Sequence, residues 1–142
     1  MRKIITLLFV LAVILCGSFA DAQDAGTKPT GRVIAYYFHG TFRCSTCYKL
    51  EQYSKEAIEA NFKDELAAGK LEFKVINIED KGNEHYVNDY QLYTKSLVLS
   101  LVKDGKQMKW KNLDKIWEYV GNKQRFIDYV KSGVAELLKE AQ

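Results

Sequence analysis

Two cysteines, Cys44 and Cys47, stand two residues apart in the stretch YFHGTFRCSTCYKLEQYSKEAIEANF, residues 37–62. A pair at this spacing can form a reversible disulfide, supply half of a metal site, or consist of two inert apolar residues. A bridge that closes so small a loop restrains little of the unfolded chain, so it is a poor structural staple. The spacing therefore favours a pair that does redox chemistry.

The elements expected on either side of the pair predict different roles for the two thiols. Val33–Phe38 is an apolar run typical of a buried strand, and Tyr48–Ala68 carries the three- and four-residue period of an amphipathic helix. Cys44 would then lie at a helix start, where unpaired N–H groups and the helix dipole favour a thiolate. We predict that Cys44 is the nucleophile and Cys47 the resolving thiol, with Arg43 as a possible stabiliser of the thiolate.

A metal site is the weaker alternative for this pair. Zinc needs further Cys or His ligands, and the chain after residue 22 offers only His39 and His85, well separated in sequence. We therefore expect no metal and no bound cofactor apart from the redox-active disulfide Cys44–Cys47. His39, directly after the predicted strand, is a candidate proton carrier, and a purely structural loop histidine is the alternative.

The remaining elements follow an order that predicts the fold. The chain should continue with strand 71–79, a short helix 83–90, strand 96–102, a hairpin turn at Asp104-Gly105, strand 106–113 and helix 122–140. This is a βαβ unit followed by ββα, and a βαβ unit has parallel strands. We predict one α/β domain over residues 32–142, with a central mixed four-stranded sheet flanked by helices.

The N-terminal segment has the layout of a signal peptide. A basic start is followed by an apolar run, residues 4–16, and then by small residues, which predicts a signal peptide over 1–22 and a flexible lead-in over 23–31. Cleavage after Ala20, an uncleaved anchor and a lipid anchor at Cys16 are the alternatives. The expected location is exported, periplasmic or otherwise extracytoplasmic, where disulfides persist.

Charge says little about partners. The net charge of the chain is +3, and no basic stripe stands out, so we expect no nucleic acid partner. The expected partners are protein thiols or a redox partner protein. Membrane contact is expected only through the signal segment or a lipid anchor.

The stretch YYFHGTFRCSTC, residues 36–47, resembles the strand, loop and Cys-x-x-Cys of thioredoxin-like proteins, and the resemblance extends over about residues 30–140. FHGTFRCSTCYKLE and YTKSLVLS resemble more narrowly a family of small exported proteins linked to arsenic-resistance gene clusters and described as a nitrophenyl-compound nitroreductase subunit. The resemblance implies a thioredoxin-like fold and an exported thiol–disulfide oxidoreductase in arsenic or nitro-compound redox metabolism. A nitroreductase normally needs a flavin or metal, and the sequence has no motif for either.

The chain departs from the thioredoxin pattern beside the cysteines. Ser45-Thr46 replaces Gly-Pro between them, and Arg43 replaces a tryptophan. Phe38 occupies the position of a buried acid, so His39 or water would have to take the proton of the second cysteine.

A second departure concerns the loop that faces the disulfide in thioredoxins, which carries a cis-proline. The only proline here is Pro29, and the matching position is Ser96, or Leu97 under another alignment. We expect Lys95 and Ser96 to form the substrate-facing loop, with a trans bond before Ser96 because a cis bond without proline costs about 2.5–4 kcal/mol.

Two classes of function follow from these residues. The first is a thiol–disulfide oxidoreductase, whose direction, reductant or oxidant, stays open. The alternative is a binding or electron-transfer accessory subunit, which captures a thiophilic ion such as arsenite or Cu(I) or serves a larger reductase.

Overall fold

Four strands form one mixed sheet in the order β2-β1-β3-β4. The computed structural model describes residues 31–142, so the predicted signal peptide, Cys16 and the lead-in up to residue 30 lie outside the described residues. The strands are β1 (Gly31–His39), β2 (Leu71–Asn77), β3 (Ser96–Lys103) and β4 (Lys106–Asn112). β1 pairs with β2 in parallel and with β3 antiparallel, and β3 pairs antiparallel with β4.

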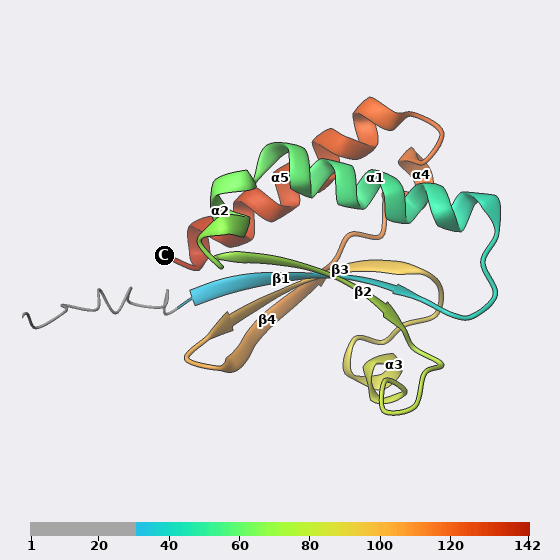
Figure 1. Ribbon diagram of the computed structural model, residues 1–142, viewed down its shortest axis with the longest axis horizontal. Helices are drawn as coiled ribbons and strands as arrows, with labels where there is room; N and C mark the ends of the chain where they lie inside the picture. Colours follow the sequence, from blue (N-terminus) through green and yellow to red (C-terminus); the bar gives the residue numbers. More distant parts are fainter. Residues whose placement is uncertain (1–30) are drawn as a thin grey trace, which may run out of the picture.

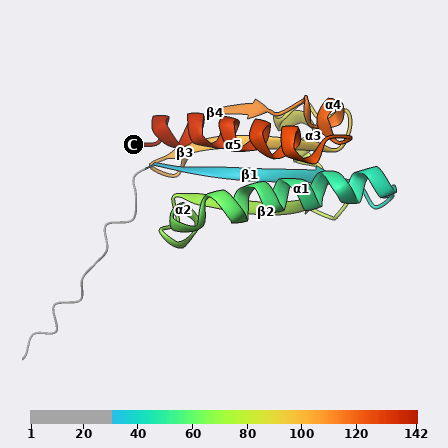
Figure 2. The ribbon, with the colours of Figure 1, turned by 90° about the horizontal axis from the view of Figure 1, so that it is seen from above.

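Helices cover the two faces of the sheet unequally. They are α1 (Ser45–Asn61), α2 (Lys63–Ala67), α3 (His85–Asp89), α4 (Ile116–Tyr119) and α5 (Lys123–Glu140). α1 and α5 lie side by side on one face, and the short α3 lies on the other (Figures 1 and 2). Element order, strand order and layers together make this an α/β thioredoxin-like fold, which confirms the predicted fold class.

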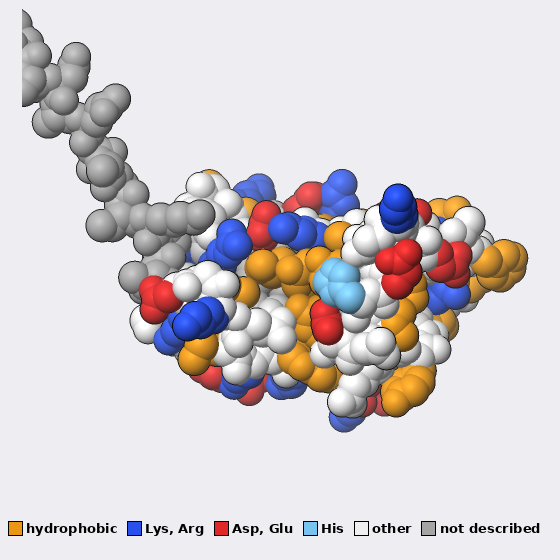
Figure 3. All heavy atoms as spheres, turned by 90° about the horizontal axis from the view of Figure 1, so that it is seen from below, with side chains coloured by type: hydrophobic (Ala, Val, Ile, Leu, Met, Phe, Trp, Pro, Cys, Tyr) orange, Lys and Arg blue, Asp and Glu red, His pale blue; other side chains and the backbone are white. Residues whose placement is uncertain are grey.

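The central position of β1 explains its continuous apolar sequence, because side chains on both faces of this strand are buried. Val33, Ala35 and Tyr37 point into the core under α1 and α5, whereas Tyr36 and Phe38 point into a second, aromatic core with residues of α3. Figure 3 views the face opposite α1 and α5, where apolar side chains show between charged ones.

The predicted single helix over residues 48–68 begins earlier than expected and is divided in two. α1 begins at Ser45, so Cys47 lies in its first turn, as expected. It ends at Asn61, and its C-cap residue Phe62 has a backbone (φ −134°, ψ 40°) outside the helical region while its ring enters the core. α2 continues from there, and Gly69 follows it at φ 68°, the left-handed conformation expected of a cap glycine.

The end of β2 and the short helix α4 also differ from the sequence expectation. β2 ends at Asn77 rather than at residue 79, because the Asn77 side chain accepts the Glu79 N–H (3.1 Å) and turns the chain away. α4 was not predicted, and it buries Ile116 and Tyr119 after β4. Of the helices within residues 31–142, none combines the length and apolar character that a bilayer crossing requires.

Phe126 should be among the most costly side chains of the α1–α5 layer to remove. It is 0 % exposed and packs nearly perpendicular to the Tyr53 ring, with 5.6 Å between ring centroids. Phe126→Ala should lower the free energy of unfolding by about 3–5 kcal/mol, measured by urea denaturation. Tyr93→Ala is the matched control: this ring is 95 % exposed, so the loss should stay within about 0.5 kcal/mol. Similar losses for both variants would contradict the described core.

Candidate active site

A disulfide joins Cys44 to Cys47, with 5.1 Å between the two Cα atoms. The pair lies where the chain passes from β1 into α1, and Figure 1 shows how these two elements are connected. Cys44 is the N-cap of α1 in an extended conformation, and the Cys47 N–H donates to its sulfur at 3.3 Å. A serine, threonine or aspartate oxygen usually fills this acceptor position. Here the sulfur fills it, so an N–H group of the first helical turn is directed at the Cys44 sulfur.

The two sulfur-bearing residues differ in accessibility. Cys44 is exposed, whereas Cys47 is 2 % exposed and packs at the start of α1. A partner can therefore reach Cys44 and not Cys47, which is the arrangement that the predicted roles of nucleophile and resolving thiol require. The roles themselves stay predictions.

Tyr37 anchors the first turn of α1 to the sheet. Its buried hydroxyl donates to the Cys47 carbonyl oxygen at 2.7 Å. Burial raises the pKa of Tyr37 to about 12, while the charges of Arg43 and Glu51 act on it in opposite directions. From the sequence, Tyr37 is one residue of an apolar strand, and the only signal for this contact is its hydroxyl, which needs a hydrogen-bond partner when it is buried.

Arg43 is held by a partner that the sequence analysis did not single out. Its guanidinium forms an ion pair with the carboxylate of Glu51 and lies over the Tyr48 ring, 4.4 Å from the ring centroid. Glu51 is eight residues beyond Arg43, and Arg43 precedes the helix, so the i, i+4 rule for helical ion pairs gives no signal for this contact. The expected thiolate stabiliser is therefore already paired with a carboxylate.

The loop between β1 and α1 is fastened to the end of β2. The Glu79 carboxylate accepts the Thr41 N–H at 3.0 Å, and hydrogen bonds from Thr41 hold the pKa of Glu79 below its usual range. Asn77 Nδ2 donates to the Thr41 hydroxyl at 3.3 Å. A Cβ on Gly40 would come within 2.5 Å of the Glu79 carboxylate, so glycine allows this close approach.

His39 and Lys95 meet at a small pocket at the same end of the sheet. His39 Nδ1 donates to the Gly40 carbonyl oxygen at 2.9 Å. Its ring and Lys95 help to line a pocket of about 150 Å³, together with Glu79 and Tyr93. The structure thus brings two of the predicted site residues together, and the proton-carrier role of His39 stays a prediction.

Ser96 begins β3 opposite Phe38 and is buried. No peptide bond within residues 31–142 is cis, so the bond before Ser96 is trans, as expected. Its hydroxyl donates to the Thr94 carbonyl oxygen at 2.9 Å, which stabilises the turn into the strand. Phe38, the predicted counterpart of the thioredoxin acid, packs in the aromatic core on the opposite face of β1 from Tyr37, so its ring points away from the helix that carries Cys47.

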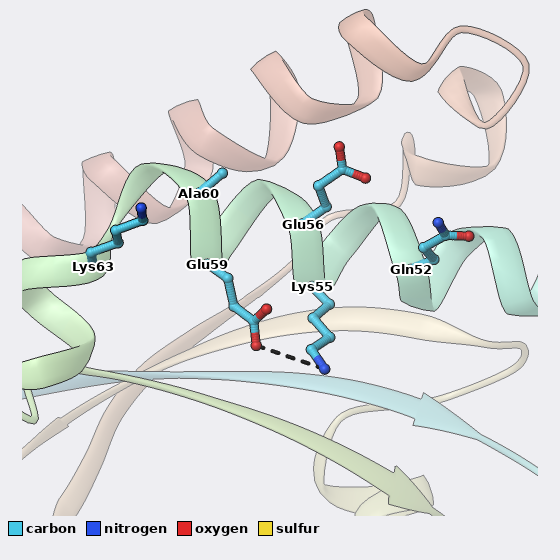
Figure 4. A pocket seen from close by; sticks show the side chains of 6 residues that line it. All are labelled: Gln52, Lys55, Glu56, Glu59, Ala60 and Lys63. Atoms are coloured by element: carbon cyan, nitrogen blue, oxygen red, sulfur yellow. Dashed lines mark ion pairs between the residues drawn. The ribbon is translucent and has the colours of Figure 1, made fainter.

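A surface groove further along α1 is not part of this site. It is lined by Gln52, Lys55, Glu56, Glu59, Ala60 and Lys63 (Figure 4). Three of its four charged side chains are paired: Lys55 with Glu59 at 3.8 Å, and Glu56 with Lys123 of α5 at 2.8 Å. Across residues 31–142, no three His, Cys, Asp or Glu side chains gather as they would around a metal ion.

The chain thus combines a thioredoxin-like fold with a Cys-x-x-Cys disulfide between β1 and α1. No family model matches the chain, and no curated protein matches it. Among solved structures, it is similar to Fasciola hepatica thioredoxin, at 16% identity over 80% of this chain and 85% of that chain, with a TM-score of 0.44. An Arabidopsis thaliana thioredoxin in the oxidized state matches at 10% identity over 68% and 76%, with a TM-score of 0.40. Because these scores are low, the fold assignment rests on the strand order and connections described above.

The asymmetry of the pair predicts how the reduced thiols react. Cys44 should be alkylated first, and its pKa should lie below the usual value of about 8.5, because the helix start favours its thiolate. Alkylation rates measured against pH, with the modified cysteine identified by mass spectrometry, test this. Preferential modification of Cys47, or an ordinary thiol pKa at Cys44, would contradict the assignment.

Tyr37 should also make stability fall in alkali. Its pKa is raised to about 12 in the folded protein, so the native state holds a proton that the unfolded chain loses near pH 10. Stability should be fully present below about pH 10 and decline as the pH rises through about 12. Urea denaturation at pH 9 and pH 11.5 measures the decline, which should be smaller in Tyr37→Phe. An equal decline in both proteins would show that Tyr37 does not cause the loss of stability. Tyr36, whose pKa is also raised to about 12, should cause the part of the decline that persists in Tyr37→Phe.

Proposed function

We propose that this protein is a thiol–disulfide oxidoreductase whose working group is the Cys44–Cys47 pair. The observation that carries the proposal is the N-cap geometry: an exposed Cys44 sulfur accepts the Cys47 N–H and is bridged to a buried partner thiol. This arrangement supplies an accessible nucleophile with a resolving thiol already within bonding distance.

The exchange reaction follows from the geometry. In the reducing direction, the Cys44 thiolate attacks one sulfur of a substrate disulfide, a mixed disulfide forms, and the other substrate sulfur leaves as a thiolate that takes a proton. Cys47 then gives up its proton, attacks the Cys44 sulfur, and releases the second substrate thiolate. The protein dithiol has become a disulfide and the substrate disulfide two thiols. The oxidising direction is the same sequence reversed.

Exposed aromatic side chains beside the disulfide and at the pocket of His39 support a polypeptide as the partner. Phe42 precedes the pair by two residues, Tyr48 follows it directly, and Tyr93 borders the pocket of His39; all three rings are exposed. Aromatic rings offer a large contact area to a polypeptide chain, so they suit a substrate that brings its own backbone and side chains to the sulfur.

The finer parts of the proposal rest on the sequence. Residues 1–22 support export to a periplasmic or other extracytoplasmic space, where a redox partner would restore the pair after each turnover. Residues 38–51 and 93–100 resemble the small exported proteins linked to arsenic-resistance gene clusters, and this resemblance supports a role in arsenic or nitro-compound redox metabolism.

Ion capture is the second candidate, because the exposed sulfur of Cys44 beside Cys47 offers two soft donors once the disulfide is reduced. In that case the pair would bind arsenite or Cu(I) without passing through a mixed disulfide. The two candidates therefore differ in whether a covalent protein adduct forms.

Replacing Cys47 with serine should trap that adduct. Without the resolving thiol, the mixed disulfide at Cys44 cannot be released quickly, so non-reducing gels of exported-fraction extracts should show a discrete adduct. Cys44→Ser is the matched control and should show none. If the two variants give the same pattern, the exchange mechanism is wrong and ion capture becomes the better explanation.

A further inference from the structure

The ion pair between Arg43 and Glu51 lies against the turn that carries both sulfurs. Arg43 immediately precedes Cys44, and its guanidinium lies over the ring of Tyr48, the residue after Cys47. The Arg43 side chain therefore lies along the first turn of α1. Its carboxylate partner comes from the next turn of the same helix.

This pair is shielded from water more than an ordinary surface pair. The side chains of Arg43 and Glu51 are 14% and 27% exposed. Both charges act on the buried Tyr37 hydroxyl, which itself donates to the Cys47 carbonyl oxygen. Charges in such a place are poorly screened, so each should act on a thiolate formed at Cys44.

We propose that Glu51 sets the reduction potential of the Cys44–Cys47 pair by opposing the positive charge of Arg43. This inference rests on the proposed oxidoreductase function. Glu51 is a positioning residue: it holds the guanidinium in the ion pair and offsets its charge, without taking part in the exchange of sulfurs.

The sign follows from which redox state carries charge at the site. Reduction of the protein by two glutathione thiols yields the dithiol and one glutathione disulfide, and only the reduced protein has a thiolate at Cys44. Arg43 stabilises that thiolate and so favours the reduced form, which raises the potential. Glu51 destabilises it and lowers the potential.

Equilibration of the full chain with glutathione buffers at pH 7 tests this directly. Glu51→Gln should shift the thiol–disulfide equilibrium towards the reduced form by about threefold to tenfold, a rise of about 15 to 30 mV. Arg43→Met should shift it the other way by a similar factor, and the double variant should lie near the natural protein. Arg43→Lys keeps the charge and should lie between the natural protein and Arg43→Met.

Glu59→Gln is the matched control, because Glu59 lies further along α1 in a half-exposed pair with Lys55. It should leave the potential unchanged. Thermal unfolding of each variant separates folding from redox effects, since a purely structural clamp would lower the melting temperature without moving the potential in opposite directions.

Two failures are distinguishable. If the natural protein shows no reversible midpoint, the proposed oxidoreductase function fails, and this inference fails with it. If the natural protein titrates, but Glu51→Gln and Arg43→Met shift the potential in the same direction or not at all, only the role of Glu51 is overturned.

Discussion

The hydrogen bond from the Cys47 N–H to the Cys44 sulfur is the contact on which the site depends. It requires Cys44 to be extended and Cys47 to be helical, so the chain must change conformation between the two cysteines. As a result, Cys44 is exposed at the surface and Cys47 is buried. The helix start supplies the local positive potential that a thiolate needs, and this supply requires no ion and no additional residue.

The rest of the domain holds this helix start in place. The hydroxyl of Tyr37, in β1, donates a hydrogen bond to the Cys47 carbonyl oxygen. The buried face of α1 packs with α5 against the sheet. The preceding loop is fastened through Thr41 to Glu79, at the end of the neighbouring strand. Strand, loop and helix are thus connected to one another within a few residues of the disulfide, so the site is built on rigid elements rather than on a free loop.

The fold could be predicted largely from the sequence because its elements have clear periods and clear ends. Three signals depend only on neighbouring residues, and the structure confirms each of them: the apolar run of β1, the turn at Asp104-Gly105 and the cap residue Gly69. The break at Phe62 could not be predicted, since it depends on a core pocket formed by residues distant in the chain. α4 could not be predicted for a different reason, because four residues are too few to show a helical period.

The site was predictable to the extent that it is local in sequence. The position of Cys44 at a helix start followed from the strand and helix on either side of it. The partners of the site did not, because the Tyr37 hydroxyl and the Glu79 carboxylate reach it through tertiary contacts. Arg43 illustrates the difference. Its position next to Cys44 can be read from the sequence, whereas its ion pair with Glu51 is seen only in the folded structure.

The most direct measurement of the central claim is the reduction potential of the natural protein, from equilibration with dithiothreitol or glutathione buffers and counting of free thiols. We expect one reversible two-electron transition of Cys44 and Cys47, with a midpoint between about −270 and −120 mV, the range of exchanging dithiols. A disulfide that remains closed below about −300 mV, as structural disulfides do, would contradict it.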